Sequence, residues 1–134
     1  MCKTIKQKVK FKTDPETLYE LLSNSKMHSR ITGQKAVISE KIGGSFETLS
    51  GKVTGINVDL LRGKRIVQAW RRSDFPSGIF SMAAVTFEKT ADGGTQLVLT
   101  HRGVPKDLIP GIEESWRDHY WKRIKLYLDE QKHA

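Results

Sequence analysis

The chain has 134 residues, of which 37% are hydrophobic and 28% are charged, and this length suits one folded domain. No apolar run approaches the roughly 20 residues that a membrane-spanning helix needs, and the N-terminus lacks the continuous apolar stretch of a signal peptide. We therefore expect a single cytoplasmic domain over residues 1–134, with no membrane partner. The lone cysteine, Cys2, cannot form an internal disulfide, which agrees with a reducing compartment.

The net charge of +8 comes from two segments, residues 1–12 and 62–72, each with five basic and no acidic residues. Two basic strands on an otherwise balanced chain have two interpretations: an acidic partner surface, or a solvated sheet face. The residues that would contact such a partner are Lys6, Lys8, Lys10, Arg65 and Arg71.

The first predicted strand covers residues 5–12, in which every second residue is a lysine. One face of this strand carries Ile5, Gln7, Val9 and Phe11, and the other carries only lysines. A period of two is typical of a half-buried strand. At an exposed sheet edge, the lysine row would also discourage pairing between copies.

Two short helices are predicted to follow the first strand. Asp14 can cap the first helix, and Pro15 suits its first helical position. Ser25 is the expected cap of the second helix, and Gly33 should end it.

Residues 36–102 alternate apolar runs with glycine-containing turns, which predicts about six further strands in antiparallel succession. In the strand expected over residues 52–61, the apolar phase changes at Gly55. A glycine at such a phase change indicates a β-bulge, which lets a sheet bend sharply. The next strand, residues 66–70, is apolar on both faces and should be central.

The last predicted element is a long amphipathic helix over Ile112–Gln131. Its apolar residues recur at a spacing of four: Ile112, Trp116, Tyr120, Ile124 and Leu128. At about 1.5 Å per residue the helix would be roughly 30 Å long and would cross the whole domain. We therefore predict an α+β fold, in which a curved antiparallel sheet of about seven strands wraps around the C-terminal helix.

The sequence offers no pattern for a metal, a cofactor or a catalytic centre. The histidines, His28, His101, His119 and His133, lack a second ligand at metal-like spacing. No P-loop, dinucleotide fingerprint or nucleophile elbow occurs. A nucleic-acid platform would need aromatic residues facing outward among the basic ones, and only Trp70 is a candidate, so we expect no nucleic-acid partner.

Six short segments occur in a specific order over about two thirds of the chain. They are Gly43–Phe46, Gly51–Gly55, Gly63–Arg71, Gly94–Leu97, His101–Pro105 and Trp116–Trp121. This order resembles the C-terminal-domain-like family of the activator of the heat-shock protein 90 ATPase, within the START-like (SRPBCC) helix-grip superfamily. The resemblance implies the helix-grip fold, in agreement with the pattern above.

The resemblance also implies a non-enzymatic, co-chaperone-like role in the stress response. Such a domain would dock on a heat-shock protein 90 type chaperone and favour its ATP-competent closed state. The eukaryotic activators carry an additional N-terminal domain that makes much of the chaperone contact.

Two alternatives remain open at this point. The wider superfamily suggests a small apolar ligand held between sheet and helix, although the same residues would otherwise simply fill the core. The candidate lining residues are Phe46, Trp70, Met82, Phe87, Leu99, His101, Trp116 and Tyr120. A cyclase or hydrolase would need polar groups that converge in the cavity, and the only candidates are Gln7, His101 and Tyr120.

Overall fold

The computed structural model describes residues 3–132, so Cys2 and His133 lie outside the described residues. Its strands are β1 (Ile5–Phe11), β2 (Val37–Ile38), β3 (Ser45–Thr48), β4 (Val53–Leu61), β5 (Arg65–Arg72), β6 (Ser81–Lys89) and β7 (Thr95–Arg102). Its α-helices are α1 (Pro15–Ser23), α2 (Ser25–Thr32), α3 (Ile109–Ser115) and α4 (Lys122–Lys132), with a π-helical segment at Trp116–Trp121 between the last two. None of the helices in residues 3–132 is long and apolar enough to cross a membrane.

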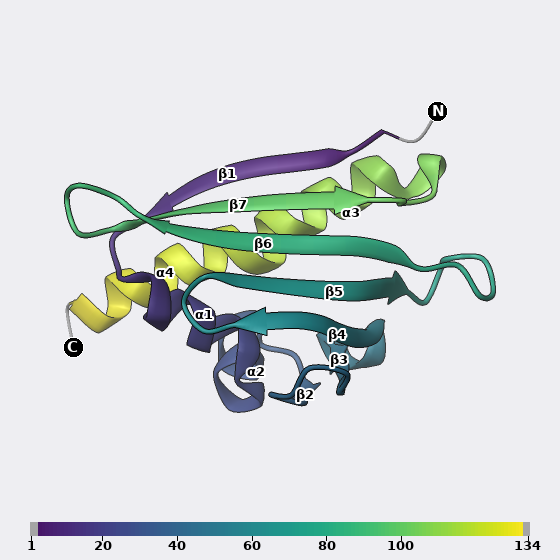
Figure 1. The fold of residues 1–134 in the computed structure, drawn as a ribbon, viewed down its shortest axis with the longest axis horizontal. Coiled ribbons are helices and arrows are strands. Elements are labelled where there is room, and N and C mark those ends of the chain that lie inside the picture. The colour runs from purple at the N-terminus through teal and green to yellow at the C-terminus, as the bar shows by residue number, and fades with distance from the viewer. Residues whose placement is uncertain (1–2, 133–134) are drawn as a thin grey trace.

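All seven strands form one antiparallel sheet in the order β1-β7-β6-β5-β4-β3-β2. The sheet lies in front of the helix α3–α4 in Figure 1, and α1 and α2 lie near one end of it. β5 is the middle strand, as predicted. The predicted fold class, an antiparallel sheet with a long C-terminal helix and two short helices after the first strand, is confirmed.

The two short helices begin at polar side chains that accept backbone N–H groups. Asp14 accepts the N–H of Thr17 at 2.7 Å, as predicted for the cap of α1. The predicted cap of α2 was wrong by one residue, because Asn24 caps it and Ser25 is already helical. The Ser25 hydroxyl instead accepts the N–H of Ile38 at 2.7 Å, which ties α2 to β2. The hydroxyl of one small residue thus anchors the short edge strand.

The bulge in β4 does not lie at Gly55. Gly55 pairs regularly with Trp70, and the register shifts further along the strand, between Asn57 and Asp59. Gly55 is required for another reason: a Cβ built there would lie 1.9 Å from the Ala69 carbonyl oxygen and 2.7 Å from the ring of Phe46. The glycine therefore makes space for a core aromatic ring. The apolar phase changes after Gly55 because Ile56 and Val58 are apolar but exposed, and the one extra residue between Asn57 and Asp59 brings only Leu60 back to the inner face.

The C-terminal helix is not a continuous α-helix. It is helical from Ile109 to Lys132, but the turn Trp116–Trp121 is π-helical, with one residue more per turn than an α-helix would contain. This wider turn brings Trp116, Tyr120 and Trp121 to the buried face together. The core is therefore densest in aromatic rings where this helix crosses the sheet.

Candidate functional site

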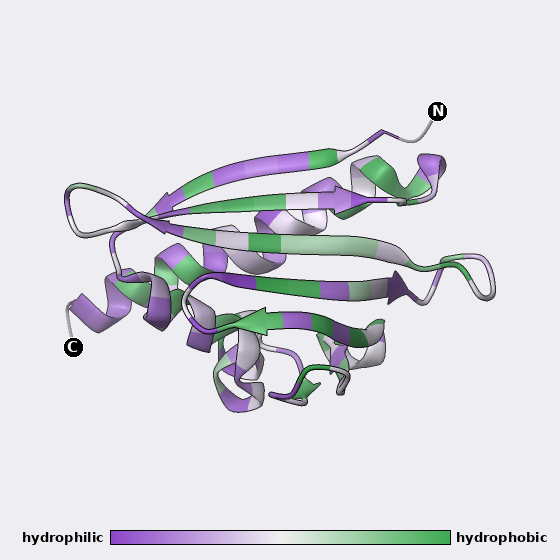
Figure 2. Ribbon diagram, in the orientation of Figure 1, coloured by the Kyte–Doolittle hydropathy of each residue, from purple (hydrophilic) through white to green (hydrophobic). Residues whose placement is uncertain are grey.

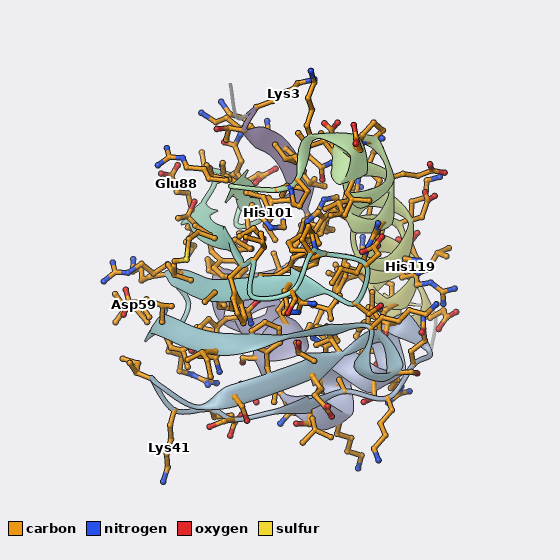
Figure 3. The ribbon with its side chains drawn as sticks, turned by 90° about the vertical axis from the view of Figure 1, so that its right-hand side faces the viewer. Lys3, Lys41, Asp59, Glu88, His101 and His119 are labelled. Carbon is orange, nitrogen blue, oxygen red and sulfur yellow. The ribbon has the colours of Figure 1, made fainter. Side chains whose placement is uncertain are left out.

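His101 lies at the centre of the interior, between the sheet and the helix, and is fully buried (Figure 3). The Trp116 indole donates its Nε1–H to His101 Nδ1 at 3.1 Å. The imidazole proton therefore lies on Nε2, which donates to Ser81 Oγ at 2.7 Å, and that hydroxyl donates to the Trp70 carbonyl at 2.9 Å. Burial lowers the pKa of His101 to about 4, so the ring is neutral at pH 7.

A second buried pair joins α2 to the π-helical segment. The Tyr120 hydroxyl donates to His28 Nε2 at 3.0 Å, and His28 Nδ1 donates to the Leu22 carbonyl at 3.0 Å. Burial lowers the pKa of His28 and raises the pKa of Tyr120 to about 12. Both rings are therefore uncharged near neutral pH, and their hydrogen bond holds the second short helix against the long one.

Gln7 forms a third polar contact, between β1 and the helix. The Trp121 indole donates to Gln7 Oε1 at 2.6 Å, and Gln7 Nε2 donates to the Glu113 carbonyl at 3.0 Å. Gln7, His101 and Tyr120 thus belong to three separate sets of hydrogen bonds. Their polar atoms join elements of the fold, and the Ser81 proton is donated to the Trp70 carbonyl rather than to the His101 ring.

The cavity between sheet and helix has a volume of about 20 Å³. Its lining residues are Leu22, His28, Thr48, Ile66, Gln68, Trp70, Val85, Trp116 and Tyr120. Such a volume holds about one water molecule, whereas pockets for small ligands span roughly 300–1,000 Å³. The aromatic side chains therefore fill the space that a carried apolar ligand would need.

Of the eight residues predicted to line a cavity, three line the small cavity of the structure. Trp70, Trp116 and Tyr120 do line the small cavity, whereas Phe46, Phe87 and Leu99 are buried without lining it and His101 lies in the hydrogen-bonded set beside it. The prediction for Met82 was wrong. Its side chain is 41% exposed, because β6 buries Ser81 and Ala83 on either side of it and turns Met82 to the outer face.

A polar groove of about 410 Å³ lies where the start of β4 and the end of β5 face α3 and the π-helical segment. Figure 3 labels His119, which lines it from the helix. Arg72 forms a two-bond pair with Asp74 on one wall, and His119 lies on the other, with a buried Nδ1 that has no hydrogen-bond partner among the described residues. Sequence reasoning gave no sign of this groove, because its walls come from four separate parts of the chain: Gln34 and residues 49–52, 72–74 and 111–119. In residues 3–132, no three His, Cys, Asp or Glu side chains are grouped to hold a metal ion.

All five residues predicted to contact an acidic partner lie on the outer face of the sheet. On β1 the lysines at positions 6, 8 and 10 are exposed and alternate with inward-facing residues, so the strand is largely hydrophilic in Figure 2. On β5, Arg65 and Arg71 alternate with the buried Ile66 and Trp70. The register of the sheet thus places both basic strands on one surface, separated by β7 and β6.

The two basic strands differ in whether their cationic side chains already have partners within the domain. Arg65 pairs with Asp59 on β4, and Arg71 donates to the carbonyls of Pro76 and Ile79 while its guanidinium lies over the Phe80 ring. The arginines of β5 therefore stabilise local structure. The four ion pairs of the described residues leave out Lys6, Lys8 and Lys10, so β1 carries a row of three exposed cations that these pairs do not engage.

A small groove of about 210 Å³ lies where β1 ends beside α4. Phe11 and Leu128 supply its apolar surface, and Lys10, Lys12 and Lys125 surround it, with Asp129 as the acidic member. Sequence reasoning missed Lys125 and Leu128 as neighbours of the basic strand. The alternation of lysines as far as Lys12 was the signal that the basic surface continues past the strand.

The chain was compared with known protein families, curated proteins and solved structures. A profile of the family described as "Activator of Hsp90 ATPase homolog 1-like protein" matches residues 12–129. The chain is 32% identical over 124 residues to the human "Activator of 90 kDa heat shock protein ATPase homolog 1", covering 92% of this chain and 36% of the relative. It is 29% identical over 123 residues to the corresponding homolog of Dictyostelium discoideum, covering 92% of this chain and 32% of that protein.

The crystal structure of an HSP90 activator from Plasmodium falciparum has the same fold. It superposes with a TM-score of 0.88 at 22% sequence identity and covers 94% of this chain and 96% of that one. The chain spans about a third of the length of the curated relatives that it matches.

Proposed function

Because this chain belongs to the Activator of Hsp90 ATPase homolog 1-like family, we propose that it is a non-enzymatic interaction domain that docks on a heat-shock protein 90 type chaperone. In this proposal docking favours the closed, ATP-competent state of the chaperone and so raises its rate of ATP turnover. The observation that carries the proposal is the family match over residues 12–129, supported by curated relatives that are named as activators of the chaperone's ATPase.

The outer face of the sheet is the docking surface in this proposal. The free lysines of β1 would meet acidic side chains of the chaperone, and charge complementarity of this kind speeds association and fixes orientation. The apolar side chains of the same face, Ile56 and Met82, are 41% exposed each and would supply contact area beside the charges. Arg65 and Arg71 would act by shaping the surface, because both are already engaged within the domain.

The buried polar groups and the small cavity of the core support a non-enzymatic role. The polar groups of Gln7, His101 and Tyr120 hydrogen-bond to other groups of the fold, and the small cavity has no room for a substrate. The same volume gives no support to the carriage of an apolar ligand. We place the proposed role in the cytoplasm, where a reduced lone cysteine is expected.

The test is a measurement of ATP turnover by the purified chaperone of the same host, with and without the purified chain. The proposal expects a higher turnover rate that saturates with the concentration of the chain. The residual turnover without the chaperone is subtracted as background. An unchanged rate together with no detectable binding would remove the proposal.

A further inference from the structure

β1 is a long, unpaired edge of the sheet. It pairs on one side with β7 over all seven residues, Ile5 to Phe11, and no strand of the described residues lies on its other side (Figure 1). The opposite edge strand, β2, has only two residues. An unpaired strand presents a row of free backbone N–H and C=O groups, which can accept another strand.

The side chains of β1 select which strand could pair there. Residues directly opposite each other across a strand pair share one face, so an added strand would place every second side chain beside Lys6, Lys8 and Lys10. A second copy of β1 would place lysines there and be repelled, whereas acidic side chains would be attracted. The lysine row thus opposes self-association and favours an acidic strand from another protein.

The groove at the end of β1 adds an apolar contact on the inner side of the same edge. It is bounded by Phe11, which is buried, and by the partly buried Leu128 of α4. Successive side chains of a strand alternate between faces, so a strand with acidic residues outward presents its other residues inward, toward this groove. Lys12 and Lys125 at the groove extend the positive charge around it.

We propose that β1 is a docking edge for an extended segment of a partner protein in which acidic and apolar residues alternate. The segment adds to the sheet as a further strand, with its acidic side chains beside Lys6, Lys8 and Lys10 and an apolar side chain in the groove between Phe11 and Leu128. The inference uses lysines that the proposed function also uses, but it does not require the partner to be a chaperone.

The probe is a seven-residue capped peptide that alternates glutamate and valine, titrated into the whole chain by calorimetry without any chaperone. Two control peptides separate the contributions: one has lysine in place of glutamate, and the other keeps the glutamates but carries a methyl group on every backbone amide nitrogen. Amide hydrogen exchange of the chain with and without the peptide locates the contact. The chain variants are K6E/K8E/K10E and, as a control with the same charge change, K26E/K35E/K41E, whose lysines are exposed elsewhere.

The acidic peptide is expected to bind and to slow exchange of amides in β1. Both control peptides should bind at least about tenfold more weakly, and K6E/K8E/K10E should lose about tenfold in affinity, since three surface charge pairs are removed. The K26E/K35E/K41E variant should stay within about twofold. Equal binding of the methylated peptide would overturn strand addition, and so would slowed exchange confined to other strands or an absence of binding. Stimulation of the chaperone that persists alongside such a result would leave the proposed function standing.

Discussion

Trp116 and Trp121 stack face to face although they are five residues apart on one helix, with ring centroids 5.6 Å apart and planes 13° from parallel. In an α-helix, neighbours on one face are three or four residues apart, so this stacking depends on the π-helical turn between them. Trp121 also meets the Phe11 ring edge-on and donates to Gln7, both on β1. The pair therefore joins the helix to the edge strand that carries the lysines.

Replacing Trp121 with alanine should destabilise the domain strongly. The substitution removes a buried indole, its stacking on Trp116 and its hydrogen bond to Gln7, so we expect a loss of about 3–5 kcal/mol in the free energy of unfolding. Leu126→Ala on the same helix is the control, because Leu126 is 61% exposed and should change stability by less than about 0.5 kcal/mol. Equal losses in urea denaturation would contradict the structural role of the pair.

Gly55→Ala should cost about 3 kcal/mol, although the change adds only a methyl group. The new carbon would lie 1.9 Å from the Ala69 carbonyl oxygen, a backbone atom that cannot move without disturbing the β4–β5 pairing. Thr54→Ala on the adjacent position should cost less than about 1 kcal/mol. A similar unfolding midpoint for wild type and Gly55→Ala would show that the sheet can relax around this site.

The hydrogen bond between Tyr120 and His28 should appear as an energetic coupling. Tyr120→Phe leaves the buried His28 Nε2 without its donor and should cost about 1–3 kcal/mol. In a double-mutant cycle with His28→Leu, the two losses should fall short of additivity by about 1 kcal/mol. Simple additivity in denaturant unfolding would indicate that the two groups do not depend on each other.

Stability should fall as the pH is lowered from 7 to 4. The unfolded His101 takes up a proton near pH 6.5, whereas burial holds the pKa of the folded side chain at about 4, so between these values the unfolded state binds more protons. The contribution of neutral His101 to the free energy of unfolding is therefore complete above pH 6.5. It falls by up to about 3 kcal/mol as the pH drops to 4. His28, whose pKa burial also lowers, adds in the same direction.

The variant His101→Gln isolates the contribution of His101 to this dependence. Its free energy of unfolding should be lower at pH 7, because the Trp116 and Ser81 partners are disturbed, but it should change less between pH 6.5 and pH 5. Denaturant titrations at several pH values measure both the free energy of unfolding at pH 7 and its change between pH 6.5 and pH 5. A variant as sensitive to pH as the wild type would contradict the assignment.

The sequence was sufficient to predict the sheet, its basic outer face and the helix behind it, because alternation and helical spacing record which side of an element is buried. It could not predict the π-helical turn, since Trp116, Tyr120 and Trp121 fit an α-helical stripe nearly as well. It placed a bulge at Gly55 because Ile56 and Val58 are apolar, whereas the structure exposes both and shifts the register only beyond Asn57. It also could not show whether aromatic residues fill a cavity or line one, because that depends on how side chains pack across the sheet.

The sequence also could not predict which cations of the outer face have partners within the fold. A count of basic residues does not distinguish Arg65 and Arg71 from Lys8. In the fold, Arg65 pairs with Asp59 on the neighbouring strand, and Arg71 donates to the Pro76 carbonyl in the loop that follows β5. Only coordinates distinguish a cation that is used within the fold from one that is free to meet a partner.

The most direct test of the proposed docking surface compares the affinity of the chaperone for three forms of the chain at one salt concentration. These are the wild type, K6E/K8E/K10E and K26E/K35E/K41E, of which the last carries the same change in net charge away from β1. Reversal of the β1 charges should weaken binding by about tenfold or more, while the control variant should stay within about twofold of the wild type. If both variants bind the chaperone equally well, the lysines of β1 do not contact the chaperone and the proposed docking surface is wrong.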